Sequence, residues 1–125
     1  MTDGVSFQDV AVARERDVVG AGECARVDAS LTHAFTLLGR PWNAAVLGAL
    51  QGGPAGFREL SRSLGGISDS VLSNRLARLC GAGLIIRTVD EGPPVSVSYA
   101  LTDAGFELMP ALEQISRWAE RHLTK

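Results

Sequence analysis

Small hydrogen-bonding side chains and two arginines recur at helical spacing in one stretch near the middle of the chain. Ser70 and Asn74 are four residues apart, Ser73 lies beside them, and Arg75 and Arg78 follow. At about 100° per residue, Ser70 and Asn74 face away from the apolar side of such a helix. That apolar side consists of Leu72, Leu76 and Leu79. Small donors and acceptors suit a helix in a DNA major groove, where they meet base edges. An amphipathic helix with a solvated polar face is the alternative.

The sequence marks both ends of this helix, which we expect over residues 68–81. Ser68 or Asp69 can cap its first turn, because a short side-chain oxygen there accepts a free backbone N–H. Gly81 and Gly83 mark its end, because glycine takes the left-handed conformation without a steric cost.

The neighbouring elements predict a winged helix-turn-helix. A short helix over residues 57–64 precedes the capped helix through the tight turn Gly65-Gly66, which is the helix-turn-helix order. Residues 84–101 follow as a β-hairpin. Its first strand, 84–89, is rich in β-forming residues, and large and small side chains alternate over 95–101. The predicted fold class is mainly α with a small β-hairpin wing.

Further helices are expected on both sides of this unit. The first closes at Gly39, and its stripe at helical spacing is Leu31, Ala34, Phe35 and Leu38. The second begins near Trp42. Its expected buried residues are Trp42, Val46, Ala49 and Leu50. The last begins at Thr102-Asp103, and Pro110 must kink or restart it. The stripe of the last helix is Leu108, Leu112, Ile115 and Ala119, with Met109 and Trp118 beside it.

Composition and charge fit one globular domain and exclude several other classes. Of the 125 residues, 46% are hydrophobic and 21% charged, and no apolar stretch is long enough for a membrane span. The N-terminus lacks signal-peptide features, so we expect a cytoplasmic protein. The net charge is −2, but five arginines and two acids give residues 57–89 a positive balance that can face phosphates. The sequence contains no nucleophile–base pair, phosphate loop or Cys/His cluster, which argues against an enzyme, a metal site and a cofactor.

Seven motifs in register resemble those of the HxlR family of bacterial transcription regulators, from about Cys24 to the C-terminus. They are Leu38-Gly39-Arg40-Pro41-Trp42, Phe57-Arg58-Glu59-Leu60, Gly66-Ile67-Ser68, Val71-Leu72-Ser73-x-Arg75-Leu76, Ala82-Gly83-Leu84, Pro93-Pro94 and Tyr99-x-Leu101-Thr102-x-x-Gly105. On this basis we divide the chain into an N-terminal arm or weak helix, 1–23, and a regulator domain, 24–125. Val5–Val19 is the segment of the arm in which a weak helix is expected.

The resemblance implies a homodimer that binds double-stranded DNA at a two-fold-related operator and represses or activates nearby genes; we expect repression. It places the first and last helices in the dimer interface, with Leu31, Phe35, Leu112, Ile115 and Trp118 as the interface residues. Many members respond to electrophiles or oxidants through a cysteine near the N-terminus, and Cys24 is similar to that residue. A small-molecule effector is the other implied partner.

Eight residues are the candidates for DNA contact: Ser68, Ser70, Ser73, Asn74, Arg75, Arg78, Arg87 and Ser96. The alternatives to DNA contact are helix capping by Ser68 and an intramolecular ion pair for Arg75. Arg87 is equally suited to a solvated strand position. For Cys24 the alternative is an inert thiol in a loosely ordered segment. Members often carry a basic pair where this chain has Asp69-Ser70, so we expect fewer phosphate contacts and a flatter salt dependence. This acidity also supports a second hypothesis, a winged helix that binds proteins only.

Overall fold

The computed structural model describes residues 21–123, and for residues 21–27 it describes the backbone alone. The arm expected at Val5–Val19 lies outside these residues. The chain divides into two compact units after Gly39. In the first unit, helix α2 spans Ala21–Leu38 and closes with a hydrogen bond from the Gly39 N–H to the Phe35 carbonyl, 2.7 Å long. The expected stop at Gly39 is confirmed, but the helix begins well before Leu31.

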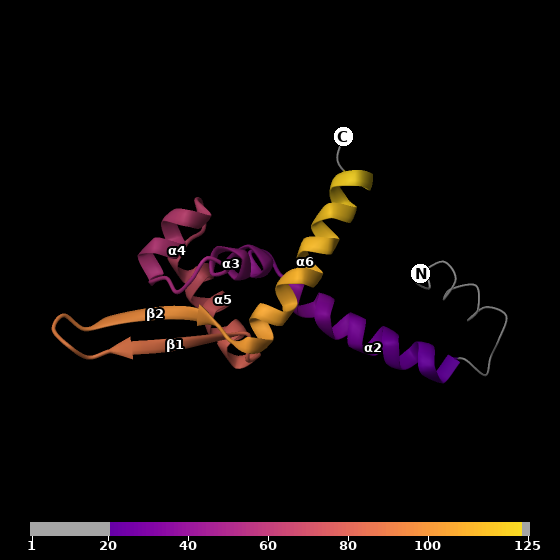
Figure 1. Ribbon diagram of the computed structural model, residues 1–125, viewed down its shortest axis with the longest axis horizontal. Helices are drawn as coiled ribbons and strands as arrows, with labels where there is room; N and C mark the ends of the chain where they lie inside the picture. Colours follow the sequence, from indigo (N-terminus) through magenta and orange to yellow (C-terminus); the bar gives the residue numbers. More distant parts are fainter. Residues whose placement is uncertain (1–20, 124–125) are drawn as a thin grey trace. The chain divides into compact units, whose positions relative to one another are not determined.

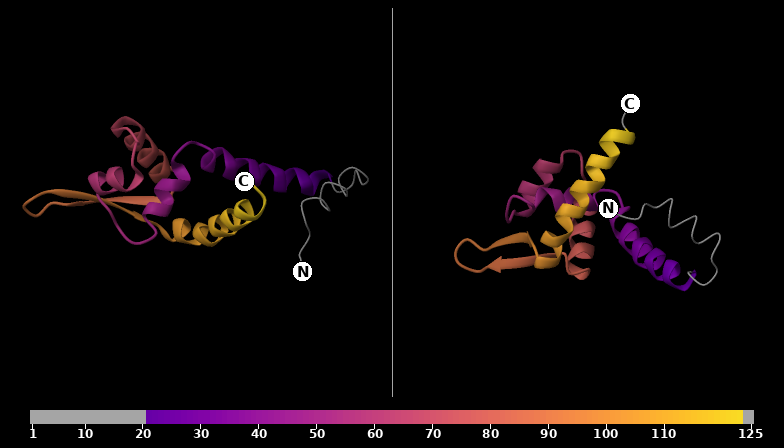
Figure 2. Two further views of the ribbon diagram at one scale, coloured as in Figure 1. Left: turned by 90° about the horizontal axis from the view of Figure 1, so that it is seen from above. Right: turned by 45° about the vertical axis from the view of Figure 1, so that its right-hand side comes forward.

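The second unit holds the helices and strands of the predicted winged helix-turn-helix in the predicted order. They are α3 (Asn43–Ala49), α4 (Phe57–Leu64), α5 (Asp69–Gly81), β1 (Ile85–Asp90), β2 (Ser96–Leu101) and α6 (Asp103–His122). Helices α3, α4 and α5 cluster together, and the hairpin extends away from them in every view (Figures 1 and 2). Helix α6 starts at the base of the hairpin (Figure 1). The fold class is therefore confirmed.

Leucines at helical spacing form the core of the second unit. The buried apolar residues are Val46, Leu47, Leu50, Leu60, Ile67, Leu72, Leu76, Leu79, Ile85, Leu101 and Met109. The three leucines of α5 are buried as the spacing predicted. In α3 the prediction was partly wrong, because Leu47 and Asn43 are also fully buried while Ala49 is only half-buried. Trp42 is half-buried too, because it precedes α3 with a left-handed backbone (φ 77°) and does not continue the helical stripe.

The hairpin is antiparallel and is tied back to the helices. Ile85 pairs with Leu101 at its base and Asp90 pairs with Ser96 near its tip. Ala55, between α3 and α4, exchanges two backbone hydrogen bonds with Tyr99, with N···O distances of 2.9 and 2.8 Å. This extra bridge pairs the segment before α4 with β2 of the hairpin. It therefore limits how far the hairpin can move relative to the helices.

A hydroxyl and a glycine join α6 to the end of α5. The Thr102 hydroxyl accepts a hydrogen bond from the Gly105 N–H (3.1 Å) and donates one to the Gly83 carbonyl (2.6 Å). Gly105 is buried, and a Cβ at this position would collide with the Leu84 carbonyl oxygen. Beyond this joint α6 continues through Pro110 as one helix. The helix therefore does not restart at Pro110, and a kink at this residue, the other expected outcome, stays a prediction.

Candidate nucleic-acid interface

Helix α5 begins with a side-chain cap and ends at a glycine. The Ser68 hydroxyl accepts a hydrogen bond from the Val71 N–H at 3.2 Å and lies 3.4 Å from the Ser70 hydroxyl. Ser68 is therefore the N-cap, as expected. At the other end the Ala82 N–H bonds to the Arg78 carbonyl, and Gly83 takes the left-handed conformation at φ 80°. The predicted bounds, 68–81, are confirmed to within the cap residue.

The outward face of α5 carries the short polar side chains that the sequence assigned to it. Ser70, Ser73, Asn74 and Arg78 are all exposed, whereas the leucines of the opposite face are buried. Apart from Arg78, these side chains are short, so a helix presenting this face can approach another surface closely. It offers hydroxyl, amide and guanidinium groups, which are the groups that hydrogen-bond to base edges and phosphates.

Arg75 is held inside the second unit by two hydrogen bonds. Its Nε donates to the Pro41 carbonyl at 2.7 Å, and its Nη1 donates to Oδ1 of Asn74 at 2.6 Å. The side chain is half-buried. The alternative of an intramolecular contact is confirmed, but the contact is not an ion pair, because the two acceptors are a carbonyl oxygen and an amide oxygen. Arg75 thus fixes α5 against the turn before α3 and orients the amide of Asn74.

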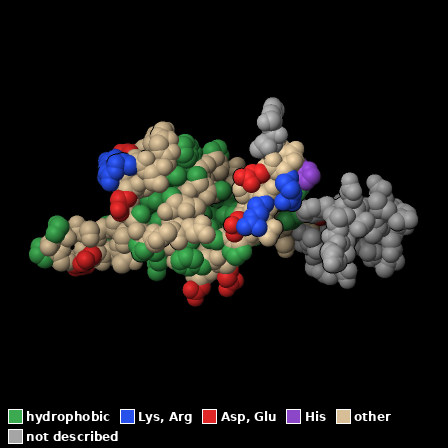
Figure 3. Space-filling model, turned by 45° about the horizontal axis from the view of Figure 1, so that its top comes forward, with side chains coloured by type: hydrophobic (Ala, Val, Ile, Leu, Met, Phe, Trp, Pro, Cys, Tyr) green, Lys and Arg blue, Asp and Glu red, His purple; other side chains and the backbone are tan. Residues whose placement is uncertain are grey.

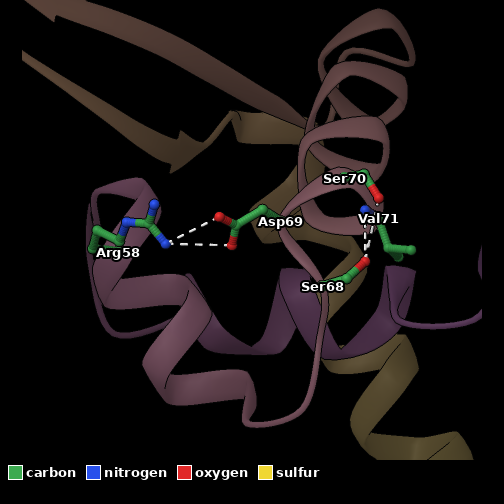
Figure 4. A network of polar contacts seen from close by, with 5 residues as sticks. All are labelled: Arg58, Ser68, Asp69, Ser70 and Val71. Atoms are coloured by element: carbon green, nitrogen blue, oxygen red, sulfur yellow. Dashed lines mark hydrogen bonds and ion pairs between the residues drawn. The ribbon is translucent and has the colours of Figure 1, made fainter.

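An ion pair links the first residue of α5 to α4. The Nη1 atom of Arg58 lies 3.2 Å from Oδ2 and 3.3 Å from Oδ1 of Asp69 (Figure 4). In the same view Ser68 and Ser70 lie on the side of α5 away from Arg58 (Figure 4). Fewer phosphate contacts were expected at Asp69-Ser70, but the negative charge of Asp69 is opposed by Arg58. Sequence reasoning missed this pair, since the partners are eleven residues apart on different helices.

The hairpin brings one arginine and an acidic tip. Arg87 on β1 is exposed and lies directly across from Tyr99 on β2. Ser96 is exposed at the start of β2, opposite Asp90. The Asp90 carboxylate accepts a hydrogen bond from the Gly92 N–H at 3.1 Å and so shapes the turn. Hydrophobic side chains are exposed at the far end of the hairpin (Figure 3).

The two cysteines lie in different units. Cys24 belongs to α2, so its backbone is helical, and its side chain lies outside the described ones. Cys80, near the end of α5, is a half-buried free thiol. Burial raises the pKa of the Cys80 thiol above its ordinary value, and the positive charge of Arg87 partly opposes that shift. In the described part of the chain, no three His, Cys, Asp or Glu residues gather where they could hold a metal ion. None of the described helices is long and apolar enough to cross a membrane.

The residues expected in a dimer interface are exposed or half-exposed. In α6, Ile115 is 42% and Trp118 49% exposed, and Leu112 is half-buried. The Trp118 ring stacks at a tilt on His122, with 5.9 Å between ring centroids. In α2, Phe35 is exposed and Leu31 half-buried. Large exposed apolar side chains of this kind are typical of surfaces that another molecule covers.

Comparison with known proteins gives this geometry a family. Residues 37–125 match the family model described as HxlR-like helix-turn-helix. The HTH-type transcriptional regulator YodB of Bacillus subtilis (strain 168) is 34% identical over 88 residues, which cover 70% of this chain and 79% of YodB. The uncharacterized HTH-type transcriptional regulator YvaP of the same organism is 38% identical over 86 residues, which cover 69% of this chain and 80% of YvaP.

Solved structures agree with this assignment. The reduced form of the transcriptional regulator YodB from B. subtilis superposes with a TM-score of 0.72 at 32% identity, covering 75% of this chain and 92% of that one. The redox regulator HypR in its oxidized form superposes with a TM-score of 0.69 at 25% identity, covering 77% of this chain and 99% of that one. The chain therefore belongs to the HxlR-like helix-turn-helix family, a family of DNA-binding transcriptional regulators and not of enzymes.

Proposed function

We propose that this regulator is a homodimeric repressor that inserts α5 into the major groove of a two-fold-related operator and lays the hairpin beside the neighbouring backbone. One observation carries the proposal. The capped helix α5 presents Ser70, Ser73 and Asn74 on an open face without large side chains, and buried leucines hold the opposite face. A solvated amphipathic helix does not require this absence of bulk, whereas close approach to base edges does.

The eight candidate residues divide into three roles. Ser70, Ser73 and Asn74 supply contacts to base edges or to nearby phosphates. The other contact residues, Ser68, Arg78, Arg87 and Ser96, engage the DNA backbone. Arg75 serves as a positioning residue, because its hydrogen bonds to Pro41 and Asn74 hold the helix and the reading amide in place.

Dimerisation through α2 and α6 is part of the proposal. The exposed apolar residues of both helices support it, and a two-fold operator requires two copies of α5. Packing is expected to hold the dimer, so it should persist under reducing conditions. A reduced protein that sediments as a monomer at micromolar concentration contradicts this part.

A redox response through Cys24 is the proposed regulation. Its support is the similarity to YodB and HypR, solved in reduced and oxidized forms respectively. The family match begins at residue 37 and does not include Cys24, so the thiol itself needs a direct test. The expected result is loss of DNA affinity after mild oxidant in the native chain and no loss in Cys24→Ser. Equal responses of the two proteins reject this role.

The experiment for DNA binding is fluorescence anisotropy with reduced protein, DNA flanking the protein's own gene and scrambled DNA as competitor. We expect competitor-resistant binding, about 5- to 150-fold weaker in Asn74→Ala because a lost bidentate base contact costs about 1–3 kcal/mol. Arg78→Gln should weaken binding to both DNAs and lower the salt slope by about one. Arg121→Gln, an exposed arginine near the end of α6, is the charge-matched control and should change nothing. Binding no tighter than to scrambled DNA at any salt concentration rejects the proposal and favours the protein-binding alternative.

A further inference from the structure

A cavity of about 450 Å³ lies between α5 and the hairpin. Helix α5 contributes Ser73, Leu76, Ala77 and Cys80, which share one face because they are spaced i, i+3, i+4 and i+7. The hairpin contributes the opposite wall, including Ile85 and Tyr99. The volume falls within the range of about 300–1,000 Å³ usual for small-molecule sites.

The apolar part of the cavity is built from the core. Leu76 and Ile85 are almost completely buried, so their positions are fixed by packing. The half-buried thiol of Cys80 lines the same part of the cavity. The accessible apolar surface of the lining comes from Ala77, Cys80 and the Tyr99 ring. A ring or short hydrocarbon chain that covers this surface removes it from water, which is favourable.

The polar part of the cavity carries one positive charge. Arg87 and Tyr99 are direct partners across the hairpin, so their side chains lie on the same face of it. Arg87 forms no ion pair with any residue whose side chain the structure describes, and no carboxylate lines the cavity. Arg87 itself lines the cavity, and its positive charge opposes the rise in the Cys80 pKa that burial causes. Ser73 adds a hydroxyl from the other wall.

We propose that this cavity binds a small organic monocarboxylate, with the carboxylate on Arg87 and an apolar ring or chain against Ala77, Cys80 and the Tyr99 ring. An anion fits because guanidinium pairs well with carboxylate and no acidic side chain competes for it. A neutral analogue leaves the arginine without a partner and loses that contact.

Occupancy of the cavity should oppose DNA binding, and this consequence rests on the proposed function. Ser73 is assigned to base or phosphate contact and Arg87 to a phosphate, and both line the cavity. A bound carboxylate takes the Arg87 charge and fills the space beside the reading face of α5. The ligand and the DNA are then mutually exclusive, and each weakens the other's binding by the same factor.

Calorimetry of the reduced full chain without DNA tests the site itself, with 2-naphthoate as the probe. We expect saturable binding of one probe per chain and at least about tenfold weaker binding of the neutral 2-naphthamide. Arg87→Gln should show a similar loss, and Ala77→Leu, which fills the cavity from an exposed position on α5, should abolish binding. Arg62→Gln removes an exposed arginine outside the cavity and should bind like the native chain. Absence of saturable binding, or equal binding by the amide or by both cavity variants, overturns the proposal.

Anisotropy with the native chain and its DNA then tests the regulation. We expect 2-naphthoate to release the DNA, with 2-naphthamide and sodium acetate at the same concentration having little effect. Probe binding in calorimetry without DNA release overturns the competition but supports the site. Probe binding by a chain that shows no specific DNA binding rejects the proposed function and supports the site, so the two failures are distinguishable.

Discussion

Large apolar side chains are buried in the helix-turn-helix core and exposed in the second half of α6. In α3, α4 and α5 the leucines that face inward are buried, with Leu72 at 0% exposure. In α6, Met109 is the last buried residue, Ile115 and Trp118 are 42% and 49% exposed, and Leu123, the C-cap residue, is 62% exposed. The hydrophobic periodicity continues through both regions, so the sequence alone does not separate them. The core of the second unit is thus buried without a second copy, whereas the exposed apolar side chains of α6 support the proposed contact with a partner copy.

Leu72→Ala should have the largest effect, because it removes a fully buried side chain from the helix-turn-helix core. We expect the free energy of unfolding to fall by about 2–5 kcal/mol, measured by urea denaturation. Leu123→Ala, the same substitution at an exposed position, should change it by about 0.5 kcal/mol or less at the same protein concentration. If the two substitutions cost the same, the contrast between the regions is wrong.

Trp118→Asp tests whether the stripe of α6 binds a second copy. The charge would be buried in an apolar interface, so we expect at least about thirtyfold weaker dimerisation, measured by sedimentation over a range of concentrations. The unfolding of the dissociated chain should be nearly unchanged, because Trp118 contributes little to the core. Trp118→Phe keeps an apolar ring and should still form the dimer. A Trp118→Asp protein that remains dimeric shows that another surface holds the two copies.

Thr102→Ala addresses the joint between the two regions. The substitution removes the N-cap of α6 and the hydrogen bond to the Gly83 carbonyl. We expect a loss of about 1–2 kcal/mol in the free energy of unfolding, measured by thermal or urea denaturation. Thr102→Ser keeps the hydroxyl and should behave nearly as the native chain does. If Thr102→Ala leaves the free energy of unfolding unchanged, α6 is attached to the core by packing around Gly105 and Met109 alone.

The order and kind of the elements could be predicted because each rests on a local pattern. The leucine spacing predicted α5, glycines marked the turns, and alternation predicted the hairpin. Local patterns failed where the chain departs from regular geometry. Trp42 continued the α3 pattern on paper, but its left-handed backbone removes it from the core face. Two acids and one arginine between Ala21 and Leu31, namely Glu23, Arg26 and Asp28, interrupt the apolar pattern and concealed the beginning of α2.

The candidate site was predictable in its surface and not in its internal contacts. Helical geometry assigned the outward face of α5 correctly. The bond from Arg75 to Pro41 spans 34 residues and the pair of Arg58 with Asp69 spans eleven, so no spacing rule detects them. The cavity beside Arg87 depends on how the hairpin packs against α5, which is a tertiary property. Each of these contacts changes the role that the sequence alone would assign to a charged residue.

The smallest predicted effect is that of Arg87→Gln on the reactivity of the Cys80 thiol, which lies at the edge of the core beside the cavity. Burial raises the pKa of this thiol and the charge of Arg87 lowers it, so loss of that charge raises the pKa further. The thiolate fraction at a given pH then falls, and alkylation by iodoacetamide should slow by about twofold, followed by mass spectrometry in a Cys24→Ser background. The pH midpoint of the reaction should move upward, which separates the charge effect from a change in access. Arg62→Gln should leave rate and midpoint unchanged. An unchanged midpoint in Arg87→Gln means that this charge does not reach the cavity, and Arg87 then belongs with the solvated surface of the wing.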